Sequence, residues 1–202
     1  MTATNSATTP ATAPVLEAAT STTARPEGKP PAAALVAALL ETERQTKQQR
    51  RQLSPEALLG TWQLRFTAPK KPAYKSGQPS GSGFYIPGLA VATLAFSRSD
   101  DTDDLLTIQN QLRVGPLKLR FTGPAKFLPK KNLLTFDFVR LQLLVGSLPL
   151  VNLPLPGKAA KTENFLATPV GKLPFFAFFA AQADYVAARG RGGGLALWVR
   201  AD

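Results

Sequence analysis

The stretch Leu59-Gly60-Thr61-Trp62-Gln63-Leu64-Arg65-Phe66-Thr67 decides the fold. Its large apolar side chains, Trp62, Leu64 and Phe66, recur at every second position with polar residues between them. Successive side chains of a strand point to opposite sides, so the alternation predicts a strand with one buried and one wet face. Gly60 has no Cβ and permits a tight bend where the strand begins. We expect this strand to open a closed β-barrel, with Trp62 as the plug at one end.

The composition excludes several classes of site. The chain of 202 residues contains no cysteine and no histidine. It therefore has no disulfide and no thiolate nucleophile, and it lacks the side chain that serves most often as a metal ligand or general base. We expect one domain with a tail, no metal site, no cofactor and no enzymatic activity.

Carboxylates are the remaining groups that could carry acid–base or metal chemistry. Four of the acidic residues gather in one place, at Asp100, Asp101, Asp103 and Asp104. They stand in a Ser/Thr/Asp cluster between two apolar stretches, which is typical of a hairpin loop. Charge runs of this kind usually remain in water, so we interpret the cluster as a solvated loop.

The net charge of +11 points to an acidic partner. Nucleic acid and the anionic surface of a membrane both carry the complementary charge. The basic residues are spread along the chain without a dense tract. The segment Arg189-Gly190-Arg191-Gly192-Gly193 is similar to the arginine–glycine segments of nucleic-acid-binding proteins, but those are usually repeated, and this one occurs once, before a predicted strand. A nucleic-acid-binding module is therefore the weaker alternative.

The chain divides into three parts. Residues 1–31 are rich in Thr, Ala and Pro and have few large apolar groups, which predicts a disordered tail. Residues 32–53 carry apolar side chains at helical spacing and end in a polar stretch, which predicts an amphipathic helix. We expect this helix to pack on the barrel, and contact with a membrane is the alternative. Residues 54–202 form the predicted barrel domain.

Two later stretches repeat the alternation of the first strand. Their apolar positions are Leu117, Leu119 and Phe121 in one and Leu134, Phe136 and Phe138 in the other. Both are predicted to be half-buried strands. After Phe138 the apolar positions change parity, so a bulge or sharp bend is expected near Arg140.

Two apolar segments, 141–155 and 173–181, come closest to a membrane element. Polar residues and prolines interrupt the first, and the second is far shorter than the roughly 20 residues of a spanning helix. The second contains four phenylalanines, Phe175, Phe176, Phe178 and Phe179. Two interpretations remain open for them: a turn packed in the core, or a lip that contacts membrane lipid or faces a ligand.

The last part of the chain completes a pattern. The segment 184–194 ends in glycines that permit a tight turn, and an apolar strand follows at 195–200. We expect this last strand to pair with the first and to close the sheet. The opening motif, together with a terminal Asp-x4-Arg-Gly and an apolar strand, resembles the plastid lipid-associated protein family, also called fibrillins. Intervening stretches such as Gly115-Pro116-Leu117 are similar to its cyanobacterial members, so the resemblance covers about residues 33–201.

The resemblance implies a lipocalin-like barrel that binds or organises apolar lipids, carotenoids or isoprenoid quinones and is not an enzyme. It also implies a peripheral location on the cytoplasmic side of cyanobacterial thylakoid membranes, or in the chloroplast of a plant or alga. The matching positions are Gly60 and Trp62 in the opening motif and Asp184, Arg189 and Gly190 in the closing one. For Arg189 we favour a structural role, stacking on an aromatic ring or pairing with Asp184, over direct ligand recognition.

The expected mechanism is non-covalent. An apolar ligand would enter a barrel or cleft lined by Trp62, Leu64, Phe66, Leu119, Phe121, Phe136 and Phe138. The basic surface would dock the protein on anionic thylakoid lipids. An eight-stranded barrel has room either for packed side chains or for one small ligand. The alternative is therefore a filled barrel that acts as a structural scaffold on membranes or pigment–protein assemblies.

Overall fold

The computed structural model describes residues 12–21, 28–99, 105–155 and 162–201, so the acidic cluster at 100–104 lies outside the described residues. The helices in this part of the chain are α1 (Thr12–Thr20), α2 (Ala32–Gln48) and α3 (Thr162–Ala167), with 3-10 turns η2 (Pro55–Leu58), η3 (Pro129–Lys131) and η4 (Val170–Lys172). The strands are β1 (Gly60–Ala68), β2 (Ala73–Lys75), β3 (Gln78–Ser80), β4 (Phe84–Tyr85), β5 (Ala90–Arg98), β6 (Leu106–Val114), β7 (Leu117–Leu128), β8 (Leu133–Phe136), β9 (Arg140–Val145), β10 (Leu148–Pro154), β11 (Phe175–Ala181), β12 (Tyr185–Gly190) and β13 (Leu195–Arg200).

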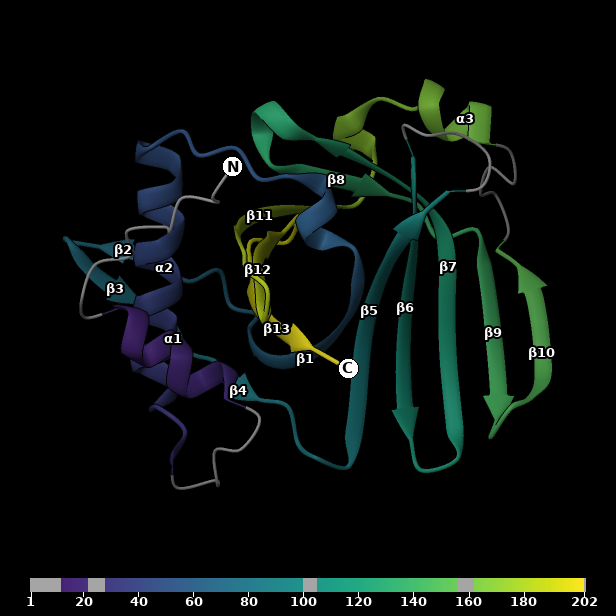
Figure 1. Ribbon diagram of the computed structural model, residues 1–202, viewed down its shortest axis with the longest axis horizontal. Coiled ribbons are helices and arrows are strands. Elements are labelled where there is room, and N and C mark those ends of the chain that lie inside the picture. The colour runs from purple at the N-terminus through teal and green to yellow at the C-terminus, as the bar shows by residue number, and fades with distance from the viewer. Residues whose placement is uncertain (1–11, 22–27, 100–104, 156–161, 202) are drawn as a thin grey trace.

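Eight of these strands close a barrel. In spatial order they are β1, β5, β6, β7, β8, β11, β12 and β13, and β13 pairs back with β1. All neighbours are antiparallel and the spatial order follows the chain order, which is the up-and-down arrangement of lipocalin-like barrels. The predicted mainly β class, with a closed antiparallel barrel behind an N-terminal helix, is confirmed (Figure 1). The expected pairing of the last strand with the first is confirmed as well.

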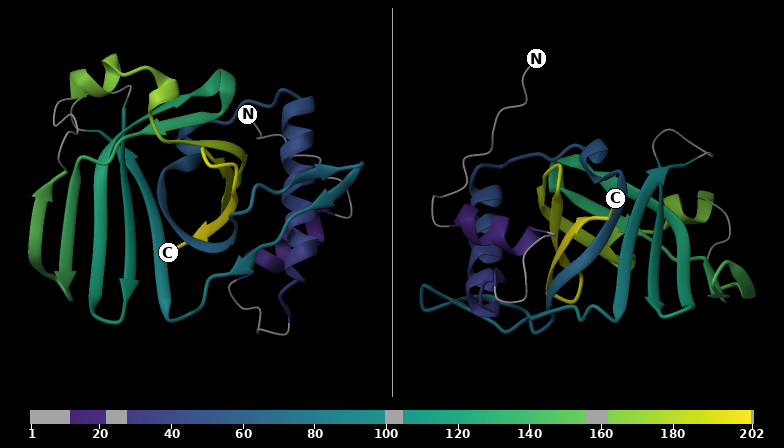
Figure 2. Two further views of the ribbon diagram at one scale, coloured as in Figure 1. Left: turned by 180° about the vertical axis from the view of Figure 1, so that it is seen from behind. Right: turned by 60° about the horizontal axis from the view of Figure 1, so that its bottom comes forward.

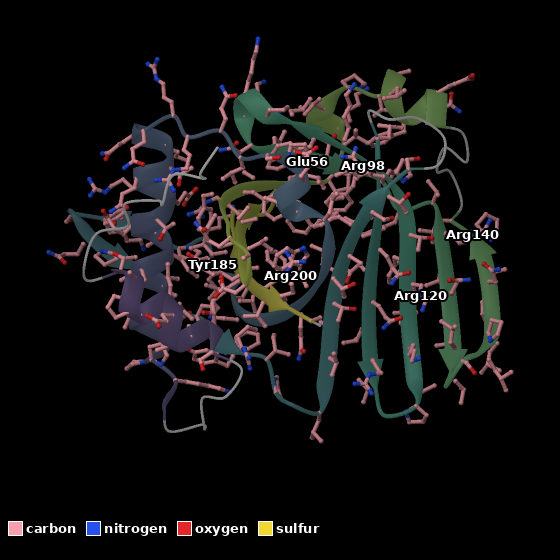
Figure 3. The ribbon with its side chains drawn as sticks, viewed as in Figure 1. Glu56, Arg98, Arg120, Arg140, Tyr185 and Arg200 are labelled. Atoms are coloured by element: carbon pink, nitrogen blue, oxygen red, sulfur yellow. The ribbon has the colours of Figure 1, made fainter. Side chains whose placement is uncertain are left out.

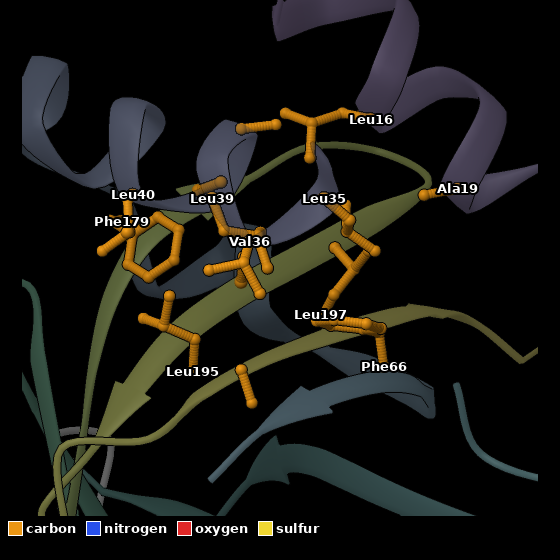
Figure 4. Packing of buried hydrophobic residues seen from close by; sticks show 14 residues of the cluster. Leu16, Ala19, Leu35, Val36, Leu39, Leu40, Phe66, Phe179, Leu195 and Leu197 are labelled. Carbon is orange, nitrogen blue, oxygen red and sulfur yellow. The ribbon is translucent and has the colours of Figure 1, made fainter. Parts of the chain in front are cut away.

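Helix α2 packs against the outer wall of the barrel. Leu35, Val36 and Leu39 lie on one face of the helix and are almost fully buried. They contact Leu195 and Leu197 of β13, which point outward from the barrel (Figure 4). The predicted helix and its packing are therefore confirmed, although the helix ends at Gln48 rather than at residue 53.

Part of the predicted disordered tail is a helix. Residues Thr12–Thr20 form α1, and the Leu16 side chain is 2% exposed where it packs on α2. The Ala- and Thr-rich composition did not indicate this helix. One leucine together with small residues is sufficient to form the apolar face that packs on α2. Residues 1–11 and 22–27 lie outside the described residues.

The link between helix and barrel is fixed locally. The Ser54 side chain accepts a hydrogen bond from the Glu56 N–H and caps η2, which starts with Pro55 as the residue types predict. Asn132, on the turn after η3, receives the Leu53 N–H on its side-chain oxygen at 2.8 Å and donates its amide to the Arg51 carbonyl at 2.7 Å. These bonds tie residues 51–53 to the barrel.

The remaining strands extend the barrel on one side. Strands β9 and β10 continue the sheet beyond β7, on the side of the molecule opposite α1 and α2 (Figures 1 and 2). The small hairpin of β2 and β3 occupies the loop after β1, and its Tyr74 hydroxyl donates to Glu41 of α2 at 2.8 Å. No helix among the described residues has the length and apolarity required to cross a membrane.

Candidate apolar binding surface

A bulge opposite Gly123 divides the long strand β7 between two partners. Residues 117–122 of β7 pair with β9, whereas residues 125–128 pair with β8. Between them, residues 137–139 form the bulge, and the N–H groups of Asp137 and Val139 donate to the Pro124 and Thr122 carbonyls at 3.1 and 2.9 Å. A Cβ on Gly123 would collide with the Asp137 carbonyl oxygen, so only glycine fits there. The bulge predicted near Arg140 is confirmed.

The bulge separates two regions with different neighbours. Above it, β8 pairs with β11 and completes the ring, and we call this region the closed half. Below it, β9 pairs with β10, which is the edge of the sheet within the described part of the chain. We call the region formed by residues 90–94, 110–122 and 140–154 the open sheet. Its inner face continues the inner wall of the barrel, because β5, β6 and β7 run through both regions.

The closed half is filled by aromatic side chains. Their ring centroids follow one another at 5.1 to 6.5 Å through Phe138, Phe136, Phe176, Phe178 and Trp198. Ile108 and Leu134 are fully buried beside them. Aromatic pairs at these separations pack favourably, so this interior is a core rather than an empty chamber.

Trp62 lies in the barrel interior, where it pairs with Leu94 of β5. Its ring is fully buried and its indole N–H donates to the Leu58 carbonyl at 2.7 Å. The Arg200 guanidinium lies 4.0 Å from the ring centroid and donates to the Ala183 and Leu59 carbonyls (Figure 3). Gly60 has a φ of +115°, and a Cβ there would strike the Arg200 guanidinium. The sequence analysis did not identify Arg200 as a partner of Trp62. Its position two residues after Trp198 does not by itself indicate such a role.

The inner face of the open sheet is apolar and accessible. Leu119 and Phe121 of β7 pair with Leu143 and Leu141 of β9, and all four side chains are half-buried. Toward the lower end the apolar side chains become exposed: Leu112, Val114, Leu117, Leu148 and Leu153 are 44 to 68% exposed. Exposed apolar side chains that share one face make this part of the sheet a candidate binding surface.

One polar side chain interrupts this face. Asn110 of β6 pairs with Leu94 on one side and Phe121 on the other, and its side chain is exposed. It stands where the filled core ends and the open sheet begins. An amide at that point can donate to or accept from a polar group on an otherwise apolar ligand.

The outer face of the open sheet is mainly polar and basic. Arg113, Lys118, Arg120 and Arg140 alternate with the apolar inner residues, as the period of a strand requires. Arg120 donates to the Gln111 side chain at 3.0 and 3.2 Å, and Arg140 donates to Asn152 at 2.9 Å (Figure 3). The sheet is therefore amphipathic, with its apolar side continuous with the barrel interior.

The seven predicted ligand-lining residues separate into three groups. Leu119, Phe121 and Phe138 lie half-buried where the open sheet meets the closed half. Trp62 and Phe136 are buried in the filled interior, with Leu64 packed partly buried beside them.

Phe66 does not share a face with Trp62 and Leu64, so that prediction is wrong. The register of β1 against β13 shifts between Leu64 and Phe66, which leaves Arg65 as an extra residue. A bulge of one residue turns the following side chains to the other face. Phe66 therefore packs under α2, outside the barrel, with its ring 5.1 Å from that of Tyr85.

Of the two interpretations of the phenylalanine segment, the lip is wrong for Phe178 and Phe179, which pack in the core. Phe175, Phe176, Phe178 and Phe179 belong to strand β11, not to a turn. Phe178 points into the barrel and Phe179 packs against α2, and they are 2 and 3% exposed. Successive side chains of a strand point to opposite faces, so the two neighbouring rings lie on opposite sides of the wall.

Arg189 locks the helix to the barrel rather than pairing with Asp184. Its guanidinium forms a two-pronged ion pair with Glu43 of α2, with Nε to Oε1 at 2.9 Å, and it also donates to the Pro72 carbonyl at 3.1 Å. Burial would raise the pKa of Glu43, but the hydrogen bonds from Arg189 and Lys47 outweigh it and hold the pKa below its usual value. The role is structural as predicted, with a different partner. Gly190 ends β12, and a Cβ there would meet no atom within 4 Å.

A second surface is basic rather than apolar. A hollow of about 470 Å³ lies between the end of α2 and η3. Its walls carry Lys47, Arg50, Arg51, Lys130 and Lys131. Among the residues that the structure describes, no group of three or more acidic side chains is placed to hold a metal ion.

Comparison with known proteins places few constraints on this chain. No family model matches the sequence, and no curated protein matches it. Among solved structures it is similar to Japanin from Rhipicephalus appendiculatus bound to cholesterol, with 12% identity over 74% of this chain and 80% of that chain and a TM-score of 0.36. That similarity is too distant to transfer a ligand or a role.

Proposed function

We propose that this protein binds an apolar lipid, without catalysing a reaction, on the inner face of the open sheet. The observation that carries the proposal is the strip of half-buried side chains formed by Leu119, Phe121, Leu141 and Leu143. This strip starts at the filled aromatic core and runs to the exposed lower end of the sheet. A ligand on the strip contacts the edge of the filled core without displacing it.

The size of the strip suits a long ligand. Residues 117–121 of β7 extend over about 13 Å, since a strand rises about 3.3 Å per residue. A leucine taken from full exposure to burial contributes about 1.5–3 kcal/mol, and half-buried side chains contribute less. Several such side chains together supply binding at a useful level. The chemical class is a fatty acyl lipid, an isoprenoid quinone or a carotenoid.

The proposed setting is the cytoplasmic surface of a thylakoid membrane in a cyanobacterium, or the chloroplast of a plant or alga. It rests on the resemblance of Gly60, Trp62, Asp184, Arg189 and Gly190 to the fibrillin motifs. The net charge of +11 supports attraction to anionic thylakoid lipids. We propose a peripheral attachment that places the open sheet where apolar lipids are stored or exchanged.

A second candidate function is a structural scaffold on membranes or pigment–protein assemblies. The filled aromatic interior of the closed half favours it, because a barrel without an internal chamber does not need a ligand to be stable. In that case the apolar face of the open sheet would contact a protein or the membrane itself. The two candidates differ in whether a free lipid binds in solution.

Titration of the purified protein with cis-parinaric acid, a fatty acid that fluoresces in an apolar environment, separates them. We expect saturable binding that carotenoid or quinone displaces. Leu119→Gln places an amide on the inner face and should weaken binding about tenfold, which corresponds to 1.4 kcal/mol. Arg120→Gln, on the outer face of the same strand, is the matched control and should bind as the wild type does.

Two results would reject lipid binding on the open sheet. One is the absence of saturable binding by a folded protein, which supports the scaffold. The other is equal affinity in both variants, which places the ligand elsewhere.

A further inference from the structure

The lower end of the open sheet carries a cluster of exposed apolar side chains that the lipid-binding strip does not require. Its members are Leu89, Val114, Leu117, Leu148 and Leu150, which are between 49 and 87% exposed. We call this cluster the rim. Leu89 is the most exposed of them and directly precedes β5, whose first residue pairs with Val114.

The rim is built on linked turns. The β6–β7 hairpin turns at Gly115 and the β9–β10 hairpin turns at Gly146, both with φ near +60°. The Gly146 N–H donates to the Pro116 carbonyl at 2.8 Å and joins the two turns. Val114, Leu117 and Leu148 are therefore presented together by a backbone with fixed geometry, rather than by independent loops.

The charge around the rim is positive. Arg113 and Lys118 flank the β6–β7 turn, and both belong to the basic outer face. The open sheet, residues 90–94, 110–122 and 140–154, carries four basic residues, Arg113, Lys118, Arg120 and Arg140, and no acidic residue. A second copy of this chain would meet this surface with the same charge, so an anionic partner fits it better.

We propose that the rim inserts into the headgroup region of an anionic lipid bilayer, with Leu89, Val114, Leu117, Leu148 and Leu150 below the headgroups and Arg113 and Lys118 at the lipid phosphates. Apolar side chains bordered by basic ones have this preference at a membrane interface. The inference rests on the membrane partner in the proposed function and names the part of the molecule that meets it. Docking in this orientation brings the lipid-binding strip directly above the bilayer.

Binding to vesicles tests the orientation. The full-length protein is sedimented with vesicles of phosphatidylglycerol mixed with phosphatidylcholine, and with vesicles of phosphatidylcholine alone. We expect binding to the anionic vesicles that weakens as salt is added, and much weaker binding to the neutral ones. Leu148→Asp places a charge in the inserted layer and should weaken vesicle binding at least tenfold. Lys118→Gln should weaken it about fivefold, as expected for one basic residue near an anionic surface.

Two matched controls separate the rim from general effects. Leu166 of α3 is 48% exposed and outside the rim, so Leu166→Asp should bind vesicles as the wild type does. Lys130 lines the basic hollow, so Lys130→Gln should have little effect compared with Lys118→Gln. Circular dichroism and thermal unfolding establish that each variant is folded before its vesicle binding is compared.

The result that would overturn the proposal is equal loss of vesicle binding in Leu148→Asp and Leu166→Asp, or binding to neutral vesicles that is as tight as to anionic ones. A dimer in solution that Leu148→Asp dissociates, without vesicle binding, would assign the rim to a second copy instead. Titration of Leu148→Asp with cis-parinaric acid keeps the two proposals apart. If Leu148→Asp retains fatty acid binding but loses vesicle binding, the result supports insertion of the rim. If it loses fatty acid binding but retains vesicle binding, the result counts against insertion of the rim and shows that Leu148 contributes to the lipid-binding strip.

Discussion

The closed half and the open sheet share three strands, β5, β6 and β7, but serve different purposes. In the closed half, β5, β6 and β7 face β11, β12 and β13 across an interior of packed aromatic rings. In the open sheet the same strands continue with an equally apolar inner face, but the edge strand β10 follows β9 and the lower part of the face is exposed. The contrast shows that apolar alternation specifies a face, while the strand partner decides whether that face is covered.

The point of change is the bulge at residues 137–139. Before the bulge, β8 pairs with β11 and closes the ring. After the bulge, the chain turns back as the β9–β10 hairpin. The closed half is therefore the source of stability, and the open sheet is the accessible surface. Each prediction below tests one part of this division.

The largest expected difference is between Trp62 and Leu148. Trp62→Ala removes a fully buried ring from the closed half and should lower the free energy of unfolding by about 3–5 kcal/mol. Leu148→Ala removes a side chain that is 68% exposed and should change it by less than about 0.5 kcal/mol. Urea denaturation measures both, and similar losses for the two variants would contradict the division.

The ion pair between Glu43 and Arg189 should stabilise the closed half from outside. Glu43→Gln should lower the free energy of unfolding by about 1.5–3 kcal/mol, because Arg189 loses a charged partner. Lys47→Gln removes only an exposed partner of Glu43 and should cost less than about 1 kcal/mol.

The same pair predicts a dependence on pH. Because the folded state holds the pKa of Glu43 below its ordinary value of 4.5, its contribution is complete above about pH 4.5 and is lost as the pH falls through the lowered value. Urea denaturation from pH 6 to pH 3 should show a smaller loss of stability in Glu43→Gln than in the wild type. An identical loss in both would exclude Glu43 as a source of acid sensitivity.

Gly123 tests the boundary between the regions. Gly123→Ala forces a Cβ against the Asp137 carbonyl oxygen and should lower the free energy of unfolding by about 1–3 kcal/mol. Gly190→Ala is the control, because a Cβ there meets no atom within 4 Å, and it should be nearly neutral. Thermal unfolding followed by circular dichroism compares them. A neutral Gly123→Ala would mean that the bulge is not fixed by this close approach.

Sequence patterns predicted the faces of the strands better than their neighbours. The alternation around Trp62 was sufficient to predict the barrel, and the change of parity after Phe138 was sufficient to predict the bulge. Strand β11 was missed because its phenylalanines are buried on both sides, in the barrel and under α2, so no alternation marks it. Strand β10 was missed because Pro149 and Pro154 argue against a strand, although an edge strand accepts them.

Other features depend on contacts that a sequence pattern does not contain. Arg65 is an extra residue in the pairing of β1 with β13, and it turns Phe66 outward. The alternation of apolar and polar residues in the sequence does not reveal it. The partners Glu43 and Arg189 are 146 residues apart, and no local signal connects them. The open sheet was not predicted as a separate region, since its apolar positions follow the same period as those of the filled interior.

The most direct test of the account is the lipid that accompanies the protein from a photosynthetic host. Wild type, Leu119→Gln and Arg120→Gln are purified without detergent, and bound lipid is measured by native mass spectrometry and by solvent extraction. The account predicts a near-stoichiometric apolar lipid in the wild type and in Arg120→Gln, and its loss from Leu119→Gln. A folded wild-type protein without lipid, or a lipid retained equally by all three proteins, would contradict a ligand surface on the open sheet.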